Sequence, residues 1–169
     1  MTPAQIAILK AYIQADPVLG PKTSGSGTDF GFIADAMNVA ASPNFWVWRT
    51  TVSEDEIVGM ASADGTNWSW PALIARSQGE RDVWGRMLSG GPINPSRANV
   101  RQGVADIFSG SANSAPAQRA HLLAISRRLA TLAEKLLATG VGSTASPANM
   151  GWEGLLTIAD IGQMFLPQP

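Results

Sequence analysis

The residues best suited to catalysis are scarce in this sequence. A nucleophilic site pairs a hydroxyl or thiol with a base, most often histidine, within hydrogen-bond reach. The chain of 169 residues has one histidine, His121, and no cysteine. His121 lies near the start of a predicted helix, one residue before an apolar stripe. We interpret it as an ordinary imidazole on a helix surface or at an interface, and the sequence predicts no catalytic residue and no enzyme.

Acidic side chains cluster at one place only, where Glu54, Asp55 and Glu56 are consecutive. Consecutive carboxylates fan around the start of a helix and do not converge on one point, so they suit the positive end of the helix dipole. A zinc site without cysteine, and with one histidine, would need carboxylates almost alone. We therefore predict no metal site and no cofactor.

Two glycine-rich stretches resemble nucleotide-binding loops only superficially. In GPKTSGSGT, residues 20–28, Lys22 precedes the glycines and no strand leads in, so the phosphate-loop spacing fails. GVGST, residues 140–144, follows a helix, whereas a dinucleotide loop follows a strand. The first stretch is typical of a flexible loop over about residues 17–28.

Four of the six tryptophans form two W-x-W pairs, Trp46/Trp48 in SPNFWVWRTT and Trp68/Trp70 in TNWSWPA. In an extended segment, Trp46 and Trp48 would point to one side and their neighbours to the other. Such a segment is apolar on both faces, and both faces must be covered.

Three uses of these rings remain open. They could form a protein core, or an interface between subunits, where Trp and Arg are enriched and Lys is depleted. They could also form a carbohydrate site with nearby polar groups, namely Asn44, Arg49 and Asn67. The nine arginines and three lysines favour the interface. We interpret the indoles as contacts made partly inside the subunit and partly between subunits.

The composition points to assembly with other chains. Apolar residues make up 45% and charged residues 15%, below the usual quarter for charged residues. Such a chain can bury a core but has few charges to solvate its outside, which indicates surface buried against other subunits. The net charge of −1 argues against nucleic-acid binding, and no apolar run approaches the ~20 residues of a membrane span.

Several helix starts carry their own capping signals. Thr2, Pro3 and Gln5 form a capping box that predicts a helix over about residues 3–15. The other expected starts are Asp29, Ser53 with Glu56, Trp70 with Pro71, Ser77 with Glu80, and Thr157 with Asp160.

The longest periodic segment runs from Pro116 to about Ala138. Apolar residues recur at steps of three and four; they are Leu122, Ile125, Leu129, Leu132 and Leu136. The predicted fold is mainly α, a small helical bundle around this long helix. A helical body, residues 1–140, would precede an extended, irregular C-terminal arm, residues 141–169.

Three stretches together resemble small structural proteins of tailed bacteriophages. They are MTPAQIAILKAYIQADPVL (1–19), FIADAMNVAASPNFWVWRT (32–50) and RRLATLAEKLLATGVGSTASPANMGWEGLLT (127–157). The likeness covers both ends well and the middle poorly. It implies a virion protein made in the host cytoplasm, and by analogy with head-to-tail adaptors a helical ring, usually twelvefold, that docks on the portal.

This resemblance sets the expected partners and contacts. The partners are further copies of the chain, the portal protein and a tail or stopper protein. The expected contact residues are Trp46, Trp48, Trp152, Leu155, Leu156 and Phe165. The alternatives are a capsid decoration or tail-completion protein, or a tryptophan-based carbohydrate-binding module.

Overall fold

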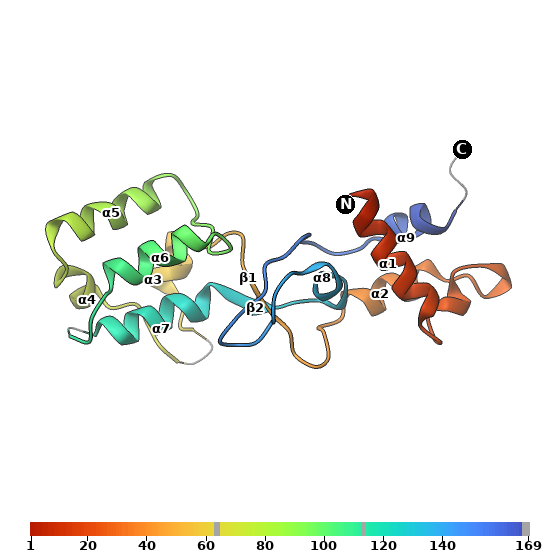
Figure 1. Ribbon diagram of the computed structural model, residues 1–169, viewed down its shortest axis with the longest axis horizontal. Coiled ribbons are helices and arrows are strands. Elements are labelled where there is room, and N and C mark those ends of the chain that lie inside the picture. Colours follow the sequence, from red (N-terminus) through yellow and green to blue (C-terminus); the bar gives the residue numbers. More distant parts are fainter. Residues whose placement is uncertain (63–64, 113, 167–169) are drawn as a thin grey trace. The chain divides into compact units, whose positions relative to one another are not determined.

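The computed structural model of the protein describes residues 1–62, 65–112 and 114–166 and confirms the mainly helical class (Figure 1). The described residues form nine α-helices and two short strands. The chain divides into two compact units, each with its own buried core. Unit 1 comprises Met1–Val47 and Leu129–Pro169, and unit 2 comprises Trp48–Arg128.

Unit 2 is an insertion in the sequence of unit 1. The chain leaves unit 1 through strand β1 (Trp46–Trp48) and returns through strand β2 (Arg127–Leu129), and the two strands pair. The N–H of Arg49 donates to the Ser126 carbonyl, and that of Ala130 to the Phe45 carbonyl, both at 2.9 Å. These two bonds place the strands antiparallel. The predicted division into a body, residues 1–140, and an arm, residues 141–169, is therefore wrong.

Unit 1 contains four α-helices whose starts follow the capping signals. They are α1 (Pro3–Ala15), α2 (Phe30–Asn38), α8 (Leu132–Leu137) and α9 (Ile158–Phe165). The capping boxes of α1 and α9 and the Asp29 cap of α2 are present, as predicted. The expected flexible loop folds as two 3₁₀ turns, η1 (Gly20–Lys22) and η2 (Gly25–Gly27).

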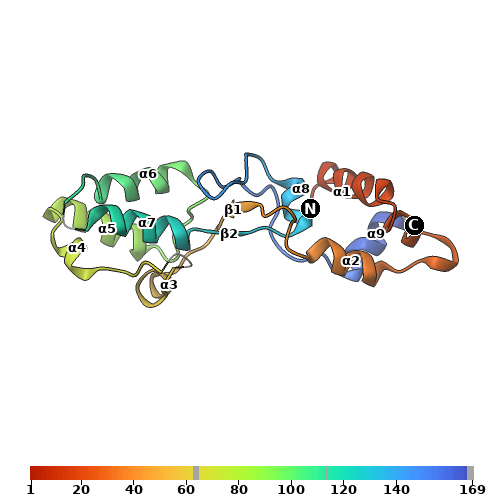
Figure 2. The ribbon, with the colours of Figure 1, turned by 90° about the horizontal axis from the view of Figure 1, so that it is seen from below.

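The core of unit 1 forms where α1 and α2 pack against α8 and α9. Its buried side chains come from both ends of the sequence: Leu9, Ile13, Leu19, Ile33, Ala34, Met37, Ala133, Leu137, Leu156, Ile161 and Met164. In Figures 1 and 2 the first and last helices lie in this one unit, although they are far apart in the sequence.

The C-terminal segment packs on unit 1 and is not an extended arm. Residues 141–157 contain no helix, as predicted, but Leu156, Ile161 and Met164 are buried in the core. The Asn38 side chain donates to the Leu156 carbonyl at 2.8 Å and accepts from the Leu156 N–H at 2.9 Å. Burial of these apolar side chains, which the sequence pattern could not assign to a partner, holds the segment in place.

Gly142 occupies a position that no other residue fits. Its φ of +69° is a left-handed conformation, and a Cβ built there would overlap the Phe45 ring. Its carbonyl accepts from the Trp46 N–H at 2.7 Å, which holds the two segments together.

We expect Gly142→Ala to lower the free energy of unfolding of unit 1 by about 2–4 kcal/mol, because it adds steric overlap to backbone strain. Urea denaturation followed by circular dichroism measures the loss. Gly25→Ala is the matched control, since Gly25 has a φ of +74° but a Cβ added there would meet no atom within 4 Å; it carries the backbone cost alone. Equal losses for both variants would contradict the close approach of Phe45.

The predicted long helix, residues 116–138, is wrong. The segment forms α7 (Ala115–Ile125), then β2, then α8. Thr131 caps α8 in a capping box with Glu134, a local signal that competes with the apolar periodicity. The apolar stripe is consequently divided: Leu122 and Ile125 join the core of unit 2, while Leu132 and Leu136 pack in unit 1.

Unit 2 contains the remaining helices, α3 (Glu54–Gly59), α4 (Trp70–Ile74), α5 (Gln78–Ser89), α6 (Ala98–Ile107) and α7. The capping boxes of α3 and α5 are present, as predicted. Helix α6 lies between α5 and α7 in the packing and beside α7 in both ribbon views (Figures 1 and 2). The buried core is Val52, Ile57, Trp84, Ile93, Ile107, Phe108, Ala115, Leu122 and Ile125.

Candidate functional site

His121 is a core residue of unit 2 and not a surface imidazole. It is 0% exposed. Its ring nitrogens lie 2.8 Å from the Ile57 carbonyl oxygen and 3.1 Å from the Thr66 carbonyl oxygen. Both ends of the ring thus contact backbone, and His121 links α7 to α3 and to the segment before α4. Its function in this geometry is structural.

The second tryptophan pair belongs mainly to the core of unit 2. The Trp68 ring stacks on Trp84 with centroids 5.3 Å apart, and Phe108 meets both rings edge-on at 6.0 and 5.6 Å. Trp70 packs edge-on against Trp68 at 5.6 Å but stays half exposed. Among the three uses considered for the tryptophan rings, this pair therefore serves chiefly as part of a protein core.

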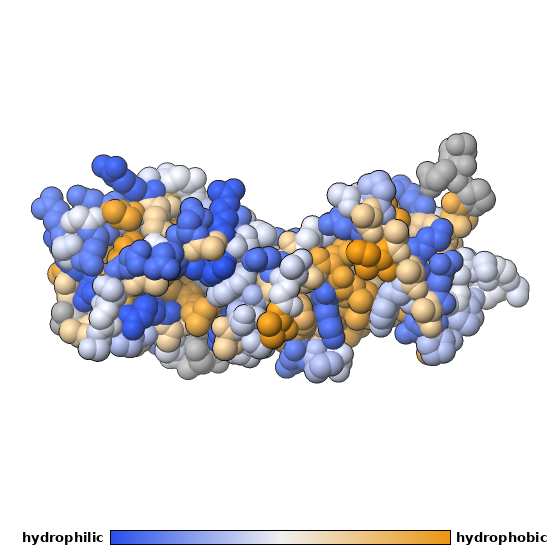
Figure 3. Space-filling model, in the orientation of Figure 1, coloured by the Kyte–Doolittle hydropathy of each residue, from blue (hydrophilic) through white to orange (hydrophobic). Residues whose placement is uncertain are grey.

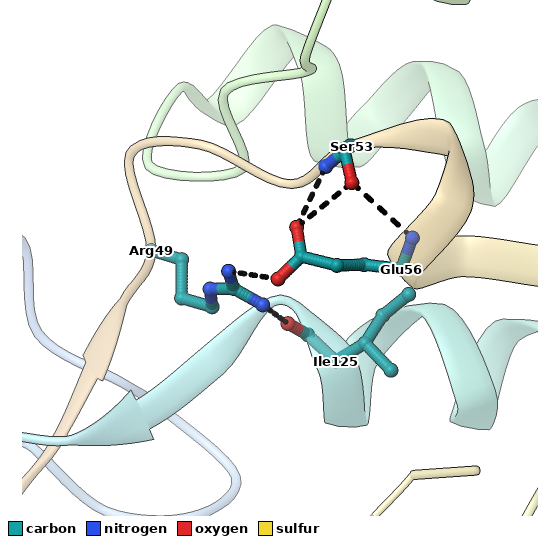
Figure 4. A network of polar contacts seen from close by, with 4 residues as sticks. All are labelled: Arg49, Ser53, Glu56 and Ile125. Carbon is teal, nitrogen blue, oxygen red and sulfur yellow. Dashed lines mark hydrogen bonds and ion pairs between the residues drawn. The ribbon is translucent and has the colours of Figure 1, made fainter. Parts of the chain in front are cut away.

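Arg49, a candidate for a carbohydrate site, is held in a polar network within unit 2 (Figure 4). Its guanidinium donates to the Glu56 carboxylate at 2.5 Å and to the Ile125 carbonyl at 3.2 Å. The Glu56 carboxylate also accepts from the Ser53 N–H at 2.8 Å. The network ties the start of α3 to the end of α7, and Glu56 serves the helix start as predicted.

The pKa of the Glu56 carboxyl lies below its ordinary value of 4.5, chiefly because of the backbone hydrogen bond from Ser53 and then the bond from Arg49. A lowered pKa in the folded state means that Glu56 contributes stability above pH 4.5 and loses it as the pH falls through the folded-state pKa.

We expect Glu56→Gln to lower the free energy of unfolding of unit 2 by roughly 1 kcal/mol at neutral pH, a modest loss because the pair is partly solvated. The difference in the free energy of unfolding between this variant and the wild type should narrow below about pH 4.5. Urea denaturation at several pH values measures it. Glu54→Gln, in the same first turn of α3, is the control and should leave the profile nearly unchanged; a constant difference across pH would contradict the proposed linkage.

An apolar cavity of about 320 Å³ opens between α6 and α7 of unit 2. Its walls are Val104 and Ala105 from α6, Ala120 and Leu123 from α7, and Trp48. Cavities of this size and lining are typical of binding sites in proteins. No sequence motif identified it, because its residues come from three separate segments.

Two arginines, Arg101 and Arg119, line this cavity. The Arg101 guanidinium lies 4.4 Å from the centroid of the Trp48 ring and donates to the Pro95 and Ser96 carbonyls at 2.6 and 2.8 Å. Burial lowers the pKa of Arg101 below its ordinary value. No acidic side chain is among the described residues that line the cavity, so its electrostatic character is positive.

The Arg119 side chain, from α7, is held near the C-terminal end of α6. It donates to the Phe108 carbonyl, and to the Gly110 carbonyl at 2.9 Å. Each guanidinium carries five N–H groups, so these backbone bonds orient both arginines and leave donors for a further acceptor.

The six expected contact residues do not form one surface. Trp48 is buried beneath Arg101, Leu156 is buried in the core of unit 1, and Phe165 stacks on Phe30 with centroids 6.4 Å apart. Trp46 and Trp152 are partly buried. Leu155 alone of the six is largely exposed, at 67%. Five of the six belong to unit 1 and Trp48 belongs to unit 2. Their use as contacts with partners stays a prediction.

Exposed apolar side chains occur on each unit, and Figure 3 shows several apolar groups at the surface on the face that it draws. The most exposed in unit 1 are Val18, Val39, Val141, Leu155, Ile158 and Leu166, and those in unit 2 include Met60, Trp70 and Ile74. These side chains are available for contacts with other molecules.

Comparisons with protein-family models, with curated proteins and with solved structures gave no match for this chain. Within the described ranges, no group of three or more acidic or histidine side chains could hold a metal ion. None of the helices described here has the length and apolar character needed to span a membrane. The fold itself defines the class of the chain as a mainly helical protein of two units.

Proposed function

We propose that the protein is a structural subunit of a tailed-bacteriophage particle, and within it an adaptor ring that joins the portal of the head to the tail. The proposal depends on where the resemblance to phage structural proteins falls in the fold. The resembling stretches, residues 1–19, 32–50 and 127–157, supply α1, most of α2, both strands and α8. They are far apart in the sequence but belong almost entirely to unit 1.

This coincidence supports the proposal for a physical reason. The resembling segments supply most of the buried side chains of one core, and a unit with its own core can in principle fold alone. The poorly resembling middle, residues 51–126, lies within unit 2. Unit 1 would then supply the fold shared with the phage proteins, and unit 2 would be an insertion specific to this chain.

The proposed mode of assembly differs from the one expected from the sequence. Because the C-terminal segment packs on its own unit, it does not act as an extended arm that leaves that unit. Contacts with the portal, the tail and neighbouring subunits would instead use exposed apolar side chains of the folded units, as interfaces between subunits commonly do.

Depletion of the protein from a phage that encodes it tests the proposal. A nonsense mutation in its gene should yield filled heads and free tails that do not join, and wild-type protein supplied in trans should restore joined particles. Labelling of an epitope-tagged copy should mark the junction of head and tail. Label spread over the capsid would favour a decoration protein, and particles that form normally without the protein would contradict the proposal.

A further inference from the structure

The lining of the α6/α7 cavity is complementary to an apolar occupant with negative charge. Its walls are aliphatic and aromatic, and the charged residues that line it, Arg101 and Arg119, are both cationic. Both guanidiniums are already oriented by backbone carbonyls, so an acceptor that binds them does not have to order a mobile side chain. This reduces the entropic cost of binding.

Unit 1 carries a segment with the complementary properties, residues 153–160. Leu155 and Ile158 are 67% and 62% exposed. Glu153 is exposed at the beginning of the segment, and Asp160 is half-buried at its end. The segment thus carries two exposed apolar side chains and, close to them in the sequence, the Asp160 carboxyl group.

Hydrogen bonds and one buried side chain tie the 153–160 segment to unit 1. Leu156 is buried, and its N–H and carbonyl both bond the Asn38 side chain, which keeps the adjacent Leu155 turned outward. The Asp160 carboxylate accepts from the Thr157 hydroxyl at 2.6 Å and the Thr157 N–H at 2.8 Å. These bonds lower the pKa of Asp160, so this carboxylate is charged at neutral pH and keeps an oxygen for another donor.

We propose that Leu155 and Ile158 of one copy of the chain dock in the α6/α7 cavity of a second copy, with the Asp160 carboxylate facing the arginines of the cavity. The contact joins two different surfaces, so every copy can both give and receive it. Such a heterologous contact generates a ring where the rotation closes. That this contact builds a ring rests on the proposed function. That two copies of the chain make the contact does not depend on it.

The contact is small, and contacts of this size are transient between two free molecules. Closure of a ring, or a portal that binds several copies at once, would strengthen it through effective concentration. The purified chain should therefore show weak association whose average mass rises with concentration.

A mixing experiment with two variants tests the pairing. Leu123→Glu places a carboxylate in the cavity wall, and Leu155→Glu removes the docking side chain; both positions are exposed, so the fold is kept. Each variant alone should remain monomeric in sedimentation equilibrium. An equimolar mixture should form pairs of one copy of each variant and nothing larger, because only one intact cavity and one intact docking segment remain in each pair.

Val83→Glu and Val141→Glu are the matched controls, being exposed valines of unit 2 and unit 1 outside the two faces; they should associate like the wild type. The proposal is overturned if the wild type stays monomeric at every concentration, if either face variant associates normally, or if the mixture stays monomeric. A monomer whose tryptophan emission responds to dodecanoate would assign the cavity to a small aliphatic carboxylate instead.

This test is independent of the particle. A phage whose heads and tails still require the protein, but whose purified variants show no pairing, keeps the proposed function and rejects these faces. Pairing in solution together with particles that assemble without the protein keeps these faces and rejects the proposed function.

Discussion

A chain in which residues 50–125 are replaced by the dipeptide Asn-Gly is expected to fold as unit 1 alone. Arg49 and Ser126 are hydrogen-bonded partners in the antiparallel pair. Asn-Gly is the preferred two-residue turn between two such residues, so the turn joins the strands in their native register. The core of unit 1 loses no buried side chain, because its members all lie outside the deletion.

The shortened chain should retain cooperative urea unfolding and a helical circular dichroism spectrum. Trp48→Thr accompanies the deletion, since Trp48 otherwise packs in unit 2. Adding Ile33→Ala, at a position 0% exposed in unit 1, should cost a further ~2–5 kcal/mol. A shortened chain that is unfolded, or indifferent to Ile33→Ala, would show that unit 1 is not an independent core.

The second large effect is expected at Phe108, the fully buried ring of unit 2. Phe108 meets Trp68 and Trp84 edge-on, and its removal leaves a cavity that the stacked indoles cannot fill without losing their geometry. We expect Phe108→Ala to lower the free energy of unfolding of unit 2 by roughly 3–5 kcal/mol.

Urea denaturation followed by tryptophan fluorescence measures this loss, since four of the six tryptophans belong to unit 2. Trp70→Ala is the control: its ring contacts the same cluster but is 51% exposed, so it should cost less than half as much. Similar losses for both variants would mean that Phe108 is not central to the core.

Local signals explain the helices that were predicted correctly. The capping residue and its partner are three positions apart in α1, α3, α5 and α9. Everything that such a helix start needs is therefore within one turn of chain, and the residue types reveal it. The same signal occurs at Thr131 and Glu134, inside the apolar periodicity that predicts one longer helix, and there the two patterns conflict.

The candidate site depended on contacts that the sequence does not encode locally. The cavity combines Trp48 with residues of α6 and α7. Its positive charge comes from Arg101 and Arg119, whose guanidiniums are positioned by backbone carbonyls of neighbouring segments. Leu155 and Leu156 are equally apolar, and only packing decides that the first is exposed and the second buried.

The sequence by itself determined the mainly helical class, the starts of most helices and the structural use of the Glu54–Glu56 cluster, because each depends on residues a few positions apart. Tertiary structure alone decided that the chain interrupts its predicted long helix, that unit 2 is inserted between two paired strands, and that the C-terminal segment returns to the first helices. The bond between Asn38 and Leu156 spans 118 positions, and pairing at that distance depends on which buried surfaces fit together, a property that no local pattern of residue types contains.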